Sequence, residues 1–192
     1  MTEKEIAVAR ADIETTEDLL ERAMKLAGLV TALFRERGVS LVVVGGSAVE
    51  FYTEGGYMSG DIDFCRRSLK GLSLRETAEV LAPLGASGMG RNWRVCGIFV
   101  DFLGIAEMES AKDWRTLETP YGDVRIIPAE LALVERILFA EQNGECLASA
   151  RQMMAAALKD PSFDWAEAER LASLPDFAVR GQMDRMKREL TA

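Results

Sequence analysis

The stretch of residues 41–64 constrains the fold of this chain more than any other part of the sequence. It opens with the apolar run LVVV, which is typical of a strand covered on both faces. The letters GGS follow at 45–47, and a glycine-rich turn from a strand into a helix can hold phosphate at the helix N-terminus. The stretch ends in DIDF at 61–64, where the period of two along a strand places both acids on one side. It therefore predicts a strand, a short helix and a second strand that carries two carboxylates.

The composition narrows the chemistry available to such a site. With 192 residues, 48% hydrophobic and 28% charged, the chain can bury a core and is ordinarily globular. Its formal charge of −8 argues against broad nonspecific binding of nucleic acid, but leaves room for a nucleotide pocket or an RNA-end site. The sequence has no histidine, which excludes Ser-His-Asp catalysis and histidine-ligated zinc. Any reaction must therefore use carboxylates, a metal, or lysine, tyrosine or cysteine.

The cysteines and the hydropathy of the chain indicate its environment. Cys65, Cys96 and Cys146 lack CxxC spacing, so we expect reduced, packed thiols and neither a zinc ribbon nor a disulfide framework. No apolar run is long enough to span a bilayer, and the N-terminal residues are charged. We therefore expect a soluble, cytoplasmic protein without a membrane partner.

The first part of the chain is expected to alternate helices and strands. Residues 1–14 are interpreted as a loose polar lead, and a helix should begin at Thr15 or Thr16 and end at Gly38. Ser73 and Glu76 have the spacing of a capping box. The further expected elements are strands at 39–44 and 61–66, helices at 47–54 and 73–84, and loops at 55–60 and 85–90.

The second part changes from hairpins to helices. We expect one hairpin from strands 91–96 and 98–105, and another over 116–127 that turns at 120–123. Three or four helices should follow, at about 129–142, 145–158, 164–173 and 176–190. The chain is thus predicted to divide into an α/β core, 1–127, and a C-terminal helical region packed on it, 128–192.

A third acid completes the predicted site. Asp101 lies between Val100 and Phe102 on a strongly apolar strand, and a buried unpaired carboxylate is costly. Such an acid has either a metal or a cationic partner, and Arg91 or Arg94 could supply a structural salt bridge. Magnesium prefers oxygen ligands, and two-metal sites share carboxylates between ions about 3.5–4 Å apart.

These residues resemble the DNA polymerase β-like nucleotidyltransferase superfamily. Val44 to Ser47, a spacer and then Asp61 to Phe64 match its motif of a hydrophobic residue, Gly, Gly or Ser, and Asp-hydrophobic-acid-hydrophobic; Asp101 matches its distant third acid. The resemblance covers residues 39–104. The segment 127–131 is similar to small bacterial and archaeal members, including toxins of the AbiEii type.

The resemblance implies an α/β (α+β) nucleotidyltransferase fold, with a mixed sheet flanked by helices and a C-terminal helical part. It also implies transfer of a nucleoside monophosphate from an NTP to an acceptor hydroxyl with release of pyrophosphate, assisted by Mg²⁺ or Mn²⁺. Asp61, Asp63 and Asp101 would bind the metals, and Asp101 would help to deprotonate the acceptor. The β- and γ-phosphates would be bound by Gly45, Gly46 and Ser47.

Several alternatives stay open. The chain could be the toxin of a toxin–antitoxin pair that modifies tRNA or protein, or a non-catalytic module that binds Mg-NTP. It is an ordinary structural domain if Asp101 points away from Asp61 and Asp63. The acceptor (tRNA, protein or small molecule) is not fixed, nor is pairing with an antitoxin or with a second copy of the chain. Five cations are candidates for phosphate or acceptor contacts or simply surface charges: Arg66, Arg67, Lys70, Arg91 and Arg94.

Overall fold

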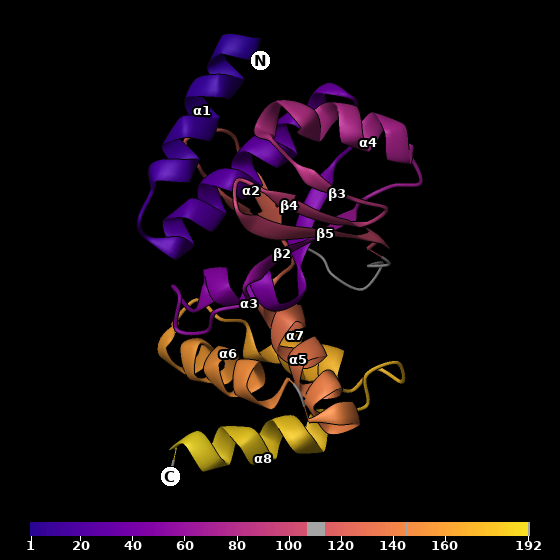
Figure 1. Cartoon of the computed structure of the whole chain (residues 1–192). Coiled ribbons are helices and arrows are strands. Elements are labelled where there is room, and N and C mark those ends of the chain that lie inside the picture. The colour runs from indigo at the N-terminus through magenta and orange to yellow at the C-terminus, as the bar shows by residue number, and fades with distance from the viewer. Residues whose placement is uncertain (107–113, 145, 192) are drawn as a thin grey trace.

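The computed structural model describes residues 1–106, 114–144 and 146–191. Within these residues, seven strands form one sheet in the order β3-β4-β5-β2-β1-β7-β6 (Figure 1). The strands are β1 (Leu41–Val44), β2 (Asp61–Arg66), β3 (Ser87–Met89), β4 (Asn92–Val95), β5 (Ile98–Ile105), β6 (Arg115–Leu117) and β7 (Val124–Ile126). The helices are α1 (Glu3–Thr15), α2 (Leu19–Glu36), α3 (Gly45–Tyr52), α4 (Leu74–Leu81), the 3-10 turn η1 (Ala82–Leu84), α5 (Ala129–Asn143), α6 (Leu147–Lys159), α7 (Trp165–Ala172) and α8 (Arg180–Thr191).

The sheet is mixed, which confirms the predicted α/β fold class. Strand β1 pairs antiparallel with β2 and parallel with β7. Strand β2 pairs parallel with β5, which continues antiparallel through β4 to β3. A parallel neighbour requires a long crossover, and residues 67–97 supply it with α4, β3 and β4.

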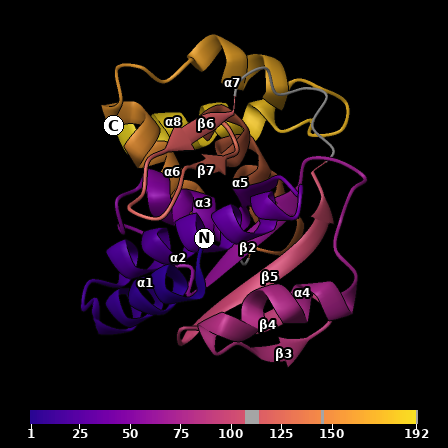
Figure 2. The same cartoon turned by 90° about the horizontal axis from the view of Figure 1, so that it is seen from above.

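Helices cover the two faces of the sheet unequally. Figure 1 shows α1, α2 and α4 on one side of the strands, and α3 with α5 to α8 on the other. Figure 2 shows β3, β4 and α4 gathered at one end, with β6, β7 and the C-terminal helices at the opposite end. Ile62, Phe64 and Val100 are fully buried, and Phe64 and Phe102 stack toward Phe34 of α2. Because side chains alternate along a strand, the acids between them face the other side.

The expected loose lead at residues 1–14 is wrong, because helix α1 occupies most of it. Thr2 and Glu5 form a capping box at its start. Ile6, Ala9 and Ile13 recur every three or four residues and are buried. The sequence of α1 therefore has the spacing typical of an amphipathic helix, although many of the surrounding residues are charged.

The starts of two helices differ from the predicted ones, and one predicted loop contains a strand, for local reasons. Helix α2 begins after Asp18, whose carboxylate accepts from the Glu21 N–H, and not at Thr15 or Thr16. Helix α3 begins at Gly45, directly at the end of β1. The predicted loop 85–90 contains strand β3, which pairs with β4. Residues 87–89 form a strand because their backbone pairs with that of β4. A glycine-rich sequence has no pattern from which such pairing can be predicted.

Both predicted hairpins and the capping box of Ser73 with Glu76 are confirmed. The four C-terminal helices are confirmed as α5 to α8, although residue 145, where one was expected to begin, lies outside the described residues.

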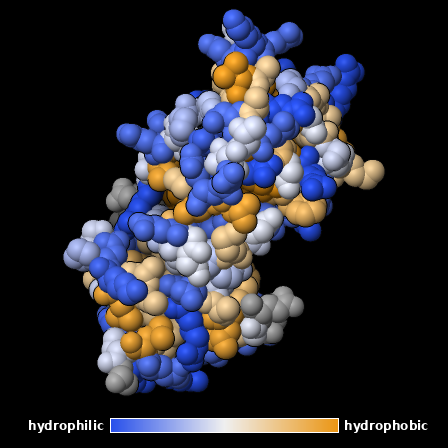
Figure 3. Space-filling model, turned by 60° about the vertical axis from the view of Figure 1, so that its left-hand side comes forward, coloured by the Kyte–Doolittle hydropathy of each residue, from blue (hydrophilic) through white to orange (hydrophobic). Residues whose placement is uncertain are grey.

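The C-terminal helices share a hydrophobic core with the sheet. Buried side chains form one cluster that extends from Ile6 to Met186. The division between residues 127 and 128 stays a prediction. No helix in the described ranges is long and apolar enough to cross a bilayer. The face shown in Figure 3 is largely hydrophilic, with smaller apolar patches between the polar side chains.

Candidate active site

Three carboxylates meet on the sheet face opposite α2. Asp61 and Asp63 project from β2, and the parallel register places Asp63 beside Asp101 of β5. One oxygen from each lies within 4.8 Å of the others, and all three residues are half-buried. Asp101 thus points toward the pair, so the condition for an ordinary structural domain is not met. The structure brings together all three acids that the sequence proposed as metal ligands.

The surroundings of Asp63 raise its pKa. Burial, followed by the charge of Asp61 and then that of Asp101, raises the pKa of Asp63 from 3.8 to about 6. The Gly46 N–H, which donates to this carboxylate, and the charge of Arg136 act in the opposite direction. A divalent cation among these oxygens would relieve the repulsion that raises this pKa.

Asp61 is held by the loop that precedes its strand. The Ser59 hydroxyl donates to Asp61 Oδ1 at 2.6 Å, and the Ser59 N–H donates to Glu50 Oε2 at 2.8 Å. Glu50 is buried on α3, and this burial raises its pKa. Ser59 and Glu50 were not predicted from the sequence. Their hydrogen bonds depend on the conformation of the loop before β2, which the sequence does not specify.

Asp101 is held by Asn92, its neighbour across the antiparallel pair of β4 and β5. The Asn92 Nδ2 group donates to Asp101 Oδ1 at 2.8 Å. The expected alternative, a salt bridge to Arg91 or Arg94, is wrong: among the described ion pairs neither arginine contacts Asp101. The register places Asn92, and not an arginine, directly opposite the acid.

The glycine-rich turn packs tightly against the acids. Gly45 has a φ of +64°, and a Cβ there would collide with the Asp63 carboxylate. A Cβ at Gly46 would collide with the Ser59 hydroxyl. The buried Ser47 hydroxyl donates to the Val44 carbonyl at 2.9 Å and accepts the Asp63 N–H at 3.0 Å. Gly45, Gly46 and Ser47 therefore position Asp63, and their contact with phosphate stays a prediction.

One cation near the acids was not expected. Arg136 of α5 is close enough for its charge to lower the pKa of Asp63. Its guanidinium lies 5.2 Å from the Phe139 ring centroid, and Nη1 lies 3.6 Å from Cys146 Sγ. The sequence does not predict that Arg136 lies near the acids. Arg136 follows Asp101 by more than thirty residues and belongs to the predicted C-terminal helical region.

The five cations suggested by the sequence lie in other surroundings. Arg67 stacks on Trp114 at 4.9 Å, and Arg94 lies 6.0 Å from the Phe99 ring centroid. Arg66 donates to the Leu69 carbonyl, and the Lys70 ammonium packs beside Gly38. Arg91 is exposed.

Comparison with known proteins identifies the fold. No protein-family model and no curated protein sequence matches the chain. The solution structure of the antibiotic-resistance factor ANT(2″)-Ia is similar over 88% of this chain and 96% of that chain, with a TM-score of 0.51 and 17% identity. An antigenic nucleotidyltransferase-like protein from Paracoccidioides brasiliensis matches over 88% and 94%, with a TM-score of 0.55 and 12% identity. A crystal structure of ANT(2″)-Ia in complex with adenylyl-2″-tobramycin matches over 82% and 98%, with a TM-score of 0.48 and 16% identity. The chain has a nucleotidyltransferase fold.

Proposed function

We propose that this chain transfers a nucleoside monophosphate from an NTP to an acceptor hydroxyl and releases pyrophosphate. The observation that carries the proposal is the cluster of Asp61, Asp63 and Asp101, whose oxygens lie within 4.8 Å of one another in a nucleotidyltransferase fold. Three carboxylates on adjacent strands are a costly arrangement without a cation to balance them.

The donor set fits Mg²⁺ or Mn²⁺. All three side chains offer carboxylate oxygens, which these hard cations prefer. Burial first, and then the charges of Asp61 and Asp101, raise the pKa of Asp63, and a cation would offset the part that comes from these charges. Asp61 and Asp63 would hold the ion that accompanies the triphosphate, and all three acids the ion at the acceptor. When bound, the cations would neutralise charge on the phosphates and make the acceptor hydroxyl more acidic.

The residues of the chain then have separate tasks. Asn92 fixes one oxygen of Asp101, and we assign to Asp101 the proton that leaves the acceptor hydroxyl. The acceptor oxygen forms a bond to the α-phosphorus. The bond from this phosphorus to the oxygen that bridges the α- and β-phosphates breaks, so pyrophosphate departs with the electron pair. Arg136 supplies positive charge at the same site. We also propose that backbone N–H groups at the start of α3, other than that of Gly46, orient the phosphates, because Val44 provides no side-chain cap.

The first prediction concerns the acids. We expect Asp61→Asn and Asp63→Asn to abolish pyrophosphate release, since each removes a charge that holds the cations. The measurement is pyrophosphate release and label transfer with each of the four NTPs, Mg²⁺ or Mn²⁺, and pools of tRNA, protein and small hydroxylated molecules. Asp176→Asn is the matched control, because Asp176 is exposed in the turn between α7 and α8.

Two results would contradict the proposal. Full activity in either variant would exclude the assigned role of the acids. Metal-dependent NTP binding without pyrophosphate release in any pool would favour the non-catalytic module. The toxin alternative stays a prediction, and it is supported if expression is lethal unless the product of a neighbouring gene is present.

A further inference from the structure

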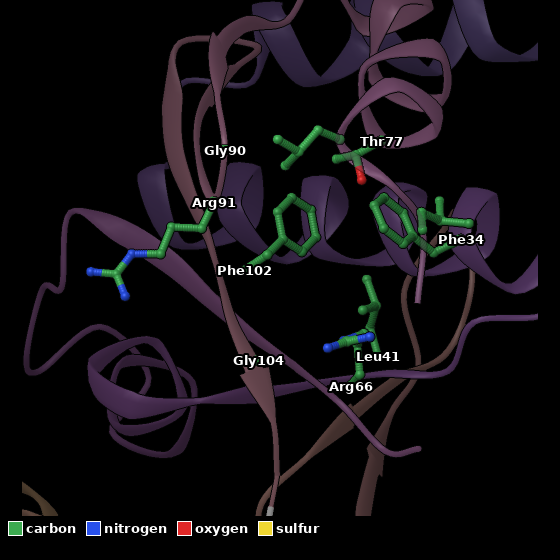
Figure 4. Close-up of a pocket in the computed structure, with 10 residues that line it drawn as sticks. Phe34, Leu41, Arg66, Thr77, Gly90, Arg91, Phe102 and Gly104 are labelled. Carbon is green, nitrogen blue, oxygen red and sulfur yellow. The ribbon is translucent and has the colours of Figure 1, made fainter. Parts of the chain in front are cut away.

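A cavity lies on the sheet face opposite the acids. It has a volume of about 350 Å³ and lies between α2, α4 and the hairpin of β4 and β5 (Figure 4). Phe102 lines it from the sheet and stacks on Phe34 of α2, with ring centroids 4.9 Å apart. Leu41, Leu72 and Leu74 add aliphatic walls. The cavity is therefore mainly apolar, with an aromatic floor.

This cavity has the character of a small-molecule site. Sites for small ligands are concave and mostly apolar, with volumes of about 300–1,000 Å³ and a few polar groups that orient the ligand. Phe102 and Leu72 are only half-buried, so apolar surface remains in contact with water. Covering that surface is favourable, because apolar area gains free energy when it leaves water.

The positively charged side chain of Arg66 lies at the cavity, where it would favour an anionic ligand. Arg66 borders the cavity beside Leu41, and the only hydrogen bond of its guanidinium in the described part of the chain is a long one, 3.4 Å, to the Leu69 carbonyl. None of the ion pairs among the described residues includes Arg66. Arg91 also borders the cavity, but Figure 4 shows its guanidinium directed away from the aromatic floor.

We propose that this cavity binds a small molecule with an apolar, ring-containing body and one anionic group, which Arg66 pairs. The aromatic floor of Phe34 and Phe102 would contact the ring, and the guanidinium would contact a carboxylate or sulfonate. The sheet separates this site from the acids, because Phe102 follows Asp101 and faces the opposite side. The proposal therefore does not depend on the nucleotidyltransferase reaction.

The test uses two fluorescent probes that differ in charge. The folded, full-length protein is titrated with 8-anilinonaphthalene-1-sulfonate and with the neutral N-phenyl-1-naphthylamine. We expect both to bind at one saturable site. Arg66→Ala should weaken binding of the sulfonate about tenfold or more, and change the neutral probe about twofold or less, because a hydrogen bond to a charged group is lost. Arg91→Ala is the matched control and should leave both affinities unchanged.

A filling variant tests the location. Thr77 is buried on α4 and borders the cavity, so Thr77→Phe should block both probes. If Thr77→Phe does not fold, as judged by circular dichroism, Leu72→Trp fills the cavity from a half-buried loop position. Asp61→Asn should bind both probes as the unaltered chain does. Equal loss of both probes in Arg66→Ala, unchanged binding in the filled variant, or no saturable binding would overturn the proposal.

Discussion

At the scale of single residues, Asp63 carries the greatest number of constraints. Its N–H donates to the Ser47 hydroxyl, and its carboxylate accepts from the Gly46 N–H and lies beside Asp61 and Asp101. One side chain thus connects the end of β1, the start of α3 and the neighbouring strand. Its charge is opposed by burial and by two like charges, which makes it sensitive to pH.

The raised pKa of Asp63 makes the stability of the folded chain depend on pH. The pKa of Asp63 is raised from 3.8 to about 6 in the folded chain, so the folded state holds an extra proton between these values. The stability contributed by this group is full below pH 3.8 and is lost as the pH rises through 6. In EDTA at pH 8, Asp63→Asn should therefore be more stable than the unaltered chain, by up to about 3 kcal/mol, and this difference should fall below about 1 kcal/mol at pH 4.

Urea unfolding at the two pH values measures the effect. Added Mg²⁺ or Mn²⁺ should stabilise the unaltered chain at pH 8, and the variant much less. An equal difference between variant and unaltered chain at both pH values would show that Asp63 does not titrate as described.

The sequence predicted which acids lie together, but not the residues that support them. Period-two alternation was enough to pair Asp61 with Asp63, and an acid on an apolar strand identified Asp101. Asn92 and Arg136 could not be found this way. The first depends on the register between β4 and β5, and the second on how a distant helix packs, and neither follows from local sequence.

At the scale of elements, the junction of β1 and α3 determines how the site is built. The helix begins at Gly45 without any connecting loop, at a φ of +64° that L-residues seldom adopt. The adjacent carboxylate of Asp63 occupies the space of a side chain at this position. Gly45 is therefore restricted in two ways: its backbone conformation disfavours other residues, and the Asp63 carboxylate leaves no room for a Cβ.

A pair of alanine substitutions separates the two restrictions. Gly90 has a φ of +65° and no atom within 4 Å of an added Cβ, so Gly90→Ala should cost only the backbone term, about 1–2 kcal/mol. Gly45→Ala has the same backbone term and also displaces Asp63, so it should lose at least about 1 kcal/mol more. Chemical denaturation compares them. Equal losses would mean that Asp63 moves aside without cost.

The elements also show where pattern reading fails. Long apolar patterns and turn residues predicted the strands other than β3, the two hairpins and the C-terminal helices. Helix α1 was missed although Ile6, Ala9 and Ile13 carry a helical period, because the charged residues around them suggested a solvated lead. It is also anchored at a distance: Asp12 accepts from the Tyr121 hydroxyl at 2.6 Å and pairs with Lys25 at 2.9 Å.

At the scale of the whole molecule, the shared core joins the sheet to the C-terminal helices. We therefore expect one cooperative unfolding transition, even though the chain was predicted to consist of two parts. Trp93 lies on β4 and Trp165 on α7, so two variants that each retain one of these as the single tryptophan, with Trp114 replaced as well, report on each part separately. The two midpoints should coincide in urea titrations. Separate midpoints would show that residues 128–192 unfold on their own.

The parallel pairing of β2 with β5 has a consequence for how the chain acquires its chemistry. Asp63 and Asp101 become neighbours only after the crossover of residues 67–97 has closed, and contacts between distant residues form slowly because loop closure costs entropy. A chain emerging from the ribosome, or one stalled in a partly folded state, has two acids in place but not the third. The metal binding that we propose would therefore be acquired only with the completed topology, so a metal titration during refolding would time the arrival of β5 beside β2.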